Sequence, residues 1–176
     1  MWHQKPGRFF HLRTQKKESV MDENNNWSWS VGGAVMRGND ILLVRHTYGA
    51  AKGKMLIPGG FVKHNEMPEA AVLREIYEET GITAQIRGFL GIRFQSKNWY
   101  AMFLLDYDSG EPRIDGDEND FSGFIPLEEA LQREDVTGLS RMLIEAISEG
   151  VPLTPLNEEY YNYSGKGKDE TSLYGL

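Results

Sequence analysis

A chain of 176 residues, of which 40% are hydrophobic and 11% aromatic, is long enough for one domain with a substantial core. It contains no cysteine, which excludes disulfides, thiolate nucleophiles and cysteine-ligated zinc, and its net charge of −7 argues against broad nonspecific binding to nucleic acid. Its apolar runs are too short to span a membrane, so we expect a cytoplasmic protein without a membrane partner.

The composition divides the chain into three segments. Residues 1–26 are basic at first and then polar, and we expect an N-terminal arm that packs on the domain or on the partner subunit of a homodimer. A basic arm that binds phosphate is the alternative. Residues 27–150 carry the periodic patterns of a folded domain, and residues 151–176 form a tail rich in proline, glycine, tyrosine and charge.

A β-hairpin is predicted at the start of the domain. Residues 28–36 form the first strand, Gly38-Asn39 is typical of a tight turn, and residues 41–45 form the returning strand.

The loop over residues 46–54 is basic and leads directly into Pro58-Gly59-Gly60. This placement makes Arg45 and Lys54 candidates for binding an anionic substrate. The alternative is that these side chains are simply solvated, as basic residues in loops usually are.

One long helix is predicted from Met67 to Thr80. Pro68 stands in its first turn, where the missing N–H is tolerated, and Gly81 stands just beyond its C-terminal end. Its apolar residues recur at steps of three and four and predict the face that packs on the sheet: Ala70, Leu73, Ile76 and Tyr77. Three glutamates fall on another face: Glu75, Glu78 and Glu79.

These glutamates are an unfavourable choice for a free helix, because Glu75 and Glu79 are like charges one turn apart, at a cost of roughly a few tenths of a kcal/mol. Clustered carboxylates suit a hard cation such as Mg²⁺, which takes oxygen ligands. The Gly60 carbonyl is a further candidate ligand, because a residue without Cβ allows a close approach. Arg74 can hold the carboxylates by pairing along the helix or with Glu66. A solvated acidic face is the alternative.

The rest of the domain is predicted to supply further strands and two short helices. The expected strands are residues 83–94, 99–106 and 121–126, and the expected helices are residues 127–132 and 140–148. Residues 106–120 form an acidic loop whose charges are mostly expected to be solvated. A single mixed sheet with helices on both faces accommodates these elements.

The stretch from Gly60 to Ile82 resembles the box motif of the MutT-like Nudix hydrolase family. The matching positions are Gly60, Glu66, Arg74-Glu75-Ile76, Glu78-Glu79 and Gly81-Ile82, each at the spacing of that motif. A weaker resemblance extends from Trp29 to Glu149. The resemblance implies an α+β fold, in which a mixed β-sheet lies between helices as an α/β/α sandwich.

The same resemblance implies Mg²⁺-dependent hydrolysis of a nucleoside diphosphate linked to another moiety, by attack of water on the phosphate anhydride. Mn²⁺ is the alternative cofactor. The implied metal ligands are Glu75, Glu78, Glu79 and Gly60, with Glu66 and Arg74 in support. Glu78 and Glu118 are the candidate catalytic bases, since relatives differ in this role. Tyr100 stands where related enzymes place a tyrosine that stacks on a base.

The exact substrate stays open, because no full signature for one substrate is present. A small-molecule nucleotide is expected, with a capped or triphosphorylated RNA end as the one nucleic-acid alternative. The alternative function is a catalytically silent protein of the same fold that binds nucleotides as a sensor or regulator. Product release with Mg²⁺, abolished by EDTA, separates the enzyme from the sensor.

Overall fold

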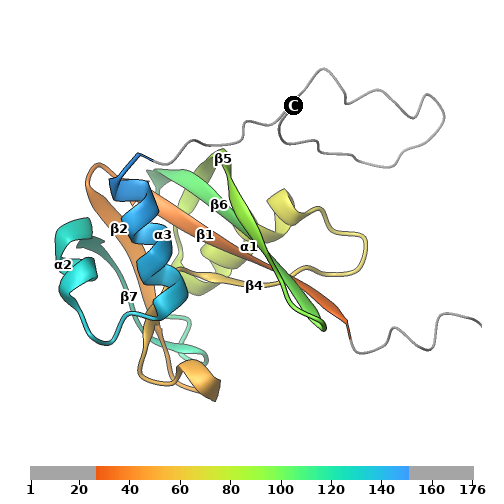
Figure 1. Ribbon diagram of the computed structural model, residues 1–176. Helices are drawn as coiled ribbons and strands as arrows, with labels where there is room; N and C mark the ends of the chain where they lie inside the picture. Colours follow the sequence, from red (N-terminus) through yellow and green to blue (C-terminus); the bar gives the residue numbers. More distant parts are fainter. Residues whose placement is uncertain (1–26, 151–176) are drawn as a thin grey trace, which may run out of the picture.

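Two apolar cores, one on each face of a mixed β-sheet, organise the domain. The computed structural model describes residues 27–150 (Figure 1). Its strands are β1 (Ser28–Arg37), β2 (Asp40–His46), β3 (Met55–Leu56), β4 (Gly59–Phe61), β5 (Thr83–Phe94), β6 (Asn98–Ser109) and β7 (Asn119–Pro126). Its helices are α1 (Pro68–Thr80), α2 (Leu127–Gln132) and α3 (Gly138–Ser148), with a short 3₁₀ turn η2 (Gly49–Ala51).

The strand β1 lies at the centre of the sheet, in the order β3-β2-β1-β6-β5. It pairs in parallel with β6, whereas β1 with β2, β2 with β7 and β5 with β6 pair antiparallel. Because β6 occupies one edge of β1, two strands share the other edge: β2 pairs at Met36 and Arg37, and β4 pairs at Ser30 to Gly32. This division places the glycines of β4 beside the start of β1, where the candidate site is built.

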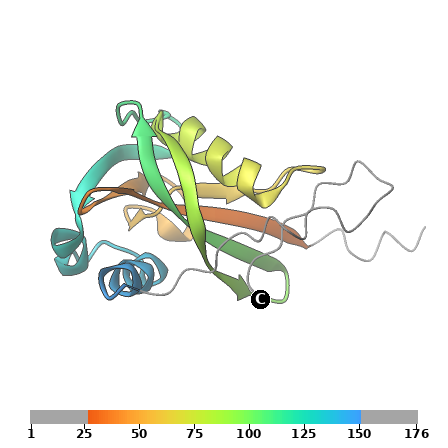
Figure 2. The same ribbon diagram turned by 90° about the horizontal axis from the view of Figure 1, so that it is seen from above.

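Side chains of the central strands alternate between the two cores. In β1, Val31 and Val35 belong to the core beneath α1, whereas Ala34 and Met36 belong to the core beneath α3. A period of two is what a sheet buried on both faces requires. Figure 2 shows α1 and α3 on opposite sides of the sheet. The predicted α+β sandwich with a mixed sheet is therefore confirmed.

Most predicted elements occur where the patterns placed them, and two differ for reasons of long-range pairing. The strand β6 continues to Ser109, beyond the predicted end at residue 106, because its last residue pairs with Thr83 of β5. Gly59 and Gly60 were predicted to form a loop but belong to β4, because both pair with the backbone of β1.

The helix α1 is rotated about its axis relative to the predicted orientation. Leu73 and Tyr77 were expected to pack on the sheet but are 36% and 53% exposed, and Ala70 is exposed as well. The residues that the helix buries are Ala71, Val72, Ile76, Glu79 and Thr80. The predicted stripe was therefore wrong except at Ile76. The rotation places Glu75 and Glu79 beside the glycines of β4, while Ala71, Val72 and Ile76 face the sheet.

No helix within residues 27–150 is long and apolar enough to cross a membrane. The predicted arm, residues 1–26, and the predicted tail, residues 151–176, lie outside the described residues. The domain boundaries on either side therefore stay predictions.

Candidate active site

The helix α1 and the strand β4 meet at the two glycines that begin the motif. Gly59 donates its N–H to Glu79 Oε2, at 3.2 Å. A Cβ on Gly60 would collide with the carboxylate of Glu75. The missing side chain of Gly60 therefore provides the space that the Glu75 carboxylate occupies against the strand.

Glu79 is a buried carboxyl group, 5% exposed. Burial raises its pKa to about 8, and the carboxylates of Glu75 and Glu118 raise it too, against the opposing effect of the Gly59 N–H. No ion pair of Glu79 occurs within residues 27–150. Glu79 therefore binds a proton more readily than an ordinary carboxyl group, and a cation beside it would oppose this shift.

Arg74 holds the other carboxylates of the motif in one network. Its guanidinium donates two hydrogen bonds to Glu66, at 2.7 and 2.8 Å, and one each to Glu75 at 2.6 Å and Glu78 at 3.0 Å. The hydrogen bonds from Arg74 lower the pKa of Glu66 to about 2. Arg74 also donates to the Phe61 carbonyl, at 3.1 Å, and so ties α1 to the end of β4.

Glu118 approaches the same region from the loop before β7. Asp115 Oδ1 accepts hydrogen bonds from the backbone N–H groups of residues 117, 118 and 119, at 3.0 to 3.1 Å, which fixes the turn. Thr47 donates its backbone N–H to the Glu118 carbonyl at 2.8 Å, and Tyr48 donates its hydroxyl to Glu118 Oε2 at 3.0 Å. The loop after β2 thus holds the Glu118 carboxylate toward α1.

A groove of about 340 Å³ runs beside β4 and the β5–β6 hairpin. Tyr100 lines it, with its hydroxyl packed so closely on Gly32 that a Cβ there would collide with it, and its stacking on a base stays a prediction. Burial raises the pKa of Tyr100. Within residues 27–150, His46 Nε2 and Arg93 Nε, from two other residues of the groove wall, have no hydrogen-bond partner. Both nitrogens are buried, although the residues that carry them line the groove.

The structure does not bring Arg45 and Lys54 into this groove. Arg45 Nε donates to Asp120 Oδ1, at 2.7 Å, and Lys54 Nζ donates to the Glu134 carbonyl, at 3.5 Å. Their substrate-binding role stays a prediction that the geometry does not favour.

The carboxylates of α1 are suited to bind a divalent cation if the side chains of Glu75 and Glu78 turn away from Arg74. Within residues 27–150, no three acidic or histidine side chains converge as a finished metal site, and Arg74 bonds to Glu75 and Glu78. These two residues and Glu79 offer only oxygen donors, which Mg²⁺ prefers. Glu79 forms no ion pair in this part of the chain, and the Glu75 carboxylate occupies the space that the missing side chain of Gly60 leaves.

Two residues near the site were not identified from the sequence: Arg93, which lines the groove, and Tyr48, which holds Glu118. His46, one of the basic residues considered for anion binding, also lines the groove, and its ring stacks on that of Tyr48 at 5.4 Å. Tyr48 and Glu118 are 70 positions apart, so spacing alone did not reveal their contact.

The chain is similar in sequence to a known domain family and to other proteins. The NUDIX domain model matches residues 27–146. An ADP-ribose pyrophosphatase of Methanocaldococcus jannaschii is 33% identical over 102 residues, which cover 54% of this chain and 60% of that protein. The NAD-capped RNA hydrolase NudC of Actinobacillus succinogenes is 39% identical over 95 residues, which cover 48% of this chain and 34% of that protein. The chain thus spans less than two thirds of the length of either relative.

Solved structures agree with the domain match. A MutT NUDIX hydrolase from Burkholderia pseudomallei has a TM-score of 0.60 and 28% identity, over 67% of this chain and 95% of that one. A NUDIX hydrolase from Nitrosomonas europaea, 21% identical with a TM-score of 0.63 over 73% of this chain and 76% of that one, shares the fold. The domain match spans most of the chain and includes the carboxylate cluster of α1, so the chain belongs to the Nudix hydrolase family.

Proposed function

We propose that this protein hydrolyses the diphosphate bridge of a nucleoside diphosphate linked to another moiety, with Mg²⁺ or Mn²⁺ as cofactor. The observation that carries the proposal is Glu79, a buried carboxyl group with a raised pKa that lies beside Glu75 and the backbone of β4. A divalent cation would supply the missing charge. The names of two relatives, an ADP-ribose pyrophosphatase and an NAD-capped RNA hydrolase, support this substrate class.

The residues of α1 would hold the cation, which supplies neutralisation of charge at the phosphoryl oxygens when bound. Glu75, Glu78 and Glu79 are the proposed side-chain ligands, with the Gly60 carbonyl beside them. Arg74 would keep the carboxylates near the strand through its bonds to Glu66 and to the Phe61 carbonyl.

A carboxylate would take the proton of the attacking water, and two candidates remain. Glu118 is held by Tyr48 and by the turn that Asp115 caps. Glu78 is held by Arg74 on the helix. The nucleoside would lie in the groove, where Tyr100 and His46 form part of the wall.

The test is a hydrolysis panel of ADP-ribose, NAD⁺, dinucleoside polyphosphates, sugar nucleotides and NAD-capped RNA with Mg²⁺, in isotopically labelled water. We expect cleavage within a phosphate anhydride, one labelled phosphate product and complete loss of activity in EDTA. Equal kcat/KM on simple phosphate monoesters would contradict the proposal, because a site that binds two adjacent phosphates loses stabilisation when one is absent. Nucleotide binding without any turnover would favour the sensor instead.

A further inference from the structure

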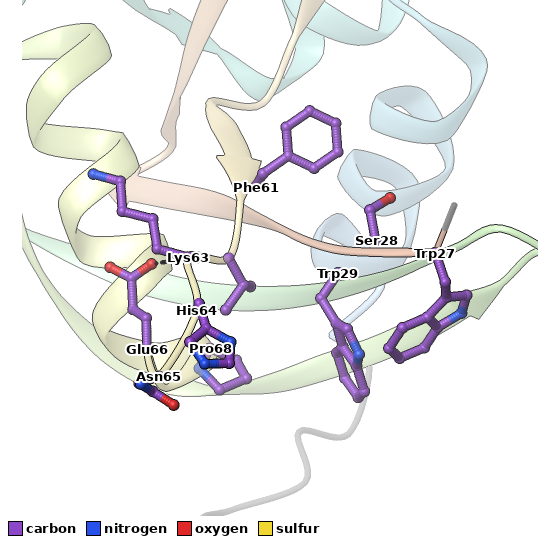
Figure 3. A pocket seen from close by; sticks show the side chains of 10 residues that line it. Trp27, Ser28, Trp29, Phe61, Lys63, His64, Asn65, Glu66 and Pro68 are labelled. Carbon is purple, nitrogen blue, oxygen red and sulfur yellow. Dashed lines mark hydrogen bonds between the residues drawn. The ribbon is translucent and has the colours of Figure 1, made fainter. Parts of the chain in front are cut away.

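A second hollow opens beside the loop that joins β4 to α1, and no role described so far uses it. Its volume is about 620 Å³, within the range of roughly 300–1,000 Å³ that is usual for small-molecule sites. Figure 3 shows Trp27 and Trp29 on one side of it and His64, Asn65 and Pro68 on the other. One side comes from the start of β1, and the other comes from the loop that leads into α1 and from the first residue of that helix.

The tryptophan side of the hollow is held in place yet remains accessible. The rings of Trp27 and Trp29 contact each other edge to face at 5.2 Å, and both contact Trp99, at 5.1 and 5.0 Å. These contacts fix the indoles, so a ligand would lose little affinity in ordering them. Trp27 is still 39% exposed. A fixed indole with an accessible surface is suited to stacking on a planar ring.

The opposite side is a tight turn with donor groups at its rim. Glu66 accepts the backbone N–H of Lys63 at 2.8 Å as well as the bonds from Arg74, and Asn65 adopts a φ of 60°. The acidic group of the hollow is thereby paired with Arg74. His64 also lines the hollow and offers a donor to the sugar or phosphate oxygens of a ligand.

The hollow adjoins the carboxylates of α1 through Lys63. Lys63 lines the hollow, and its Nζ lies 3.8 Å from Glu78 Oε1. The hollow and the carboxylates are therefore separated by one lysine side chain. The groove that contains Tyr100 reaches the same end of β4, since Ser28 and Phe61 line both spaces. A diphosphate at the carboxylates would have an aromatic-walled space on each side.

We propose that the hollow between Trp27, Trp29 and Pro68 is a second stacking site, which binds the planar aromatic group in the half of the substrate that points away from the groove. The inference rests on the proposed function for the diphosphate between the two halves. It assigns a narrower substrate class to the protein: compounds in which a diphosphate joins two sugar-linked aromatic groups.

The direct test compares two substrates that differ by one aromatic group, NAD⁺ and ADP-ribose. Trp27→Ala should lower kcat/KM for NAD⁺ on the order of tenfold to a hundredfold, as expected for a lost stacking contact, and change kcat/KM for ADP-ribose far less. Trp27→Phe retains a ring and should recover most of the loss. Phe94→Ala is the matched control, because Phe94 is a 63% exposed member of the same aromatic cluster that does not line the hollow.

Equal losses for both substrates, or no loss for either, would overturn the stacking site. The second result is also expected if residues 1–26 or a second copy of the chain occupies the hollow. Cleavage of ADP-ribose but not of NAD⁺ by the wild type would overturn the stacking site and leave the proposed function standing.

A binding experiment separates this inference from the proposed function. Nicotinamide mononucleotide should quench tryptophan fluorescence saturably in EDTA, whereas ribose 5-phosphate should not. In Trp27→Ala, the concentration of nicotinamide mononucleotide that gives half of the maximal quenching should rise. That result supports the stacking site even if the wild type cleaves neither diphosphate, which would refute the proposed function alone. Absence of saturable quenching by nicotinamide mononucleotide counts against the stacking site.

Discussion

The helices α1 and α3 cover opposite faces of one sheet, yet they bury different chemistry. The helix α3 buries Leu143 and Ile144 against the sheet. Its buried Ser140 hydroxyl accepts a hydrogen bond from the backbone N–H of Ile57, at 3.1 Å. The helix α1 instead buries the carboxyl group of Glu79 and leaves Leu73 and Tyr77 exposed. The residues that α3 buries therefore serve mainly the stability of the fold. The helix α1 leaves two large apolar side chains exposed and places carboxylates beside β4.

The largest expected effect comes from α1. Glu79→Gln should lower turnover of the cleaved nucleotide by ~100-fold or more, because the site loses charge that it needs in the transition state. The melting temperature of the metal-free protein should stay unchanged or rise, since a buried acid is replaced by a neutral amide of the same size. Steady-state kinetics and thermal unfolding check both statements. A variant that unfolds, with activity following the folded fraction, would make Glu79 a structural residue.

The opposite result is expected on α3. Ile144→Ala should lower the free energy of unfolding by about 2–5 kcal/mol, because it empties space in a fully buried position. Activity per folded molecule should match the wild type. Urea unfolding and active-site kinetics measured below the unfolding transition test this. A large fall in kcat with unchanged stability would break the division of roles between the two helices.

Variants of α1 and α3 should also differ in how the free energy of unfolding depends on pH. The Glu79 carboxyl group has a pKa of about 8 in the folded chain against an ordinary 4.5. The unfolded chain loses this proton first, so metal-free stability should fall as pH rises between these values, at up to about 1 kcal/mol per pH unit. Glu79→Gln should flatten this fall, and Ile144→Ala should shift the whole curve without changing its slope. Parallel slopes in the wild type and Glu79→Gln would contradict the pKa of Glu79.

The smallest expected effect, on kcat, distinguishes the two candidate bases, Glu78 on α1 and Glu118 before β7. Tyr48→Phe removes the hydrogen bond to Glu118, and kcat should fall about fivefold with little change in KM, as expected for one solvent-exposed hydrogen bond of about 1 kcal/mol. Tyr77→Phe, on the exposed face of α1, is the matched control. An unchanged kcat in Tyr48→Phe would assign proton transfer to Glu78.

The elements of the fold were predictable where local signals mark them. Pro68 and Gly81 bracket α1 within one residue of the prediction, and the alternating pattern of residues 83–94 places β5 correctly. The strand β4 was not predictable, because glycines have low strand propensity and the pairing of Gly59 and Gly60 with β1 is a long-range contact.

The rotation of α1 was missed for a physical reason. The rule that large apolar side chains face the core fails at a helix whose inner face must carry Glu79, so Leu73 and Tyr77 misled the prediction. Similarly, sequence spacing identified Arg45 as a basic residue near the site but not its partner Asp120, 75 residues away. The carboxylates themselves were predictable, because the motif specifies their spacing within one helix.

Glu79 of α1 is buried and forms no ion pair within residues 27–150, and we propose that a divalent cation supplies the missing positive charge. The most direct test is the melting temperature of the wild type and Glu79→Gln in EDTA and over a Mg²⁺ titration, near pH 8. Because a ligand of the native state stabilises it, the wild-type melting temperature should rise saturably with Mg²⁺, and the variant should start equal or higher and rise much less. Equal rises in both proteins, or no rise in the wild type, would contradict the account.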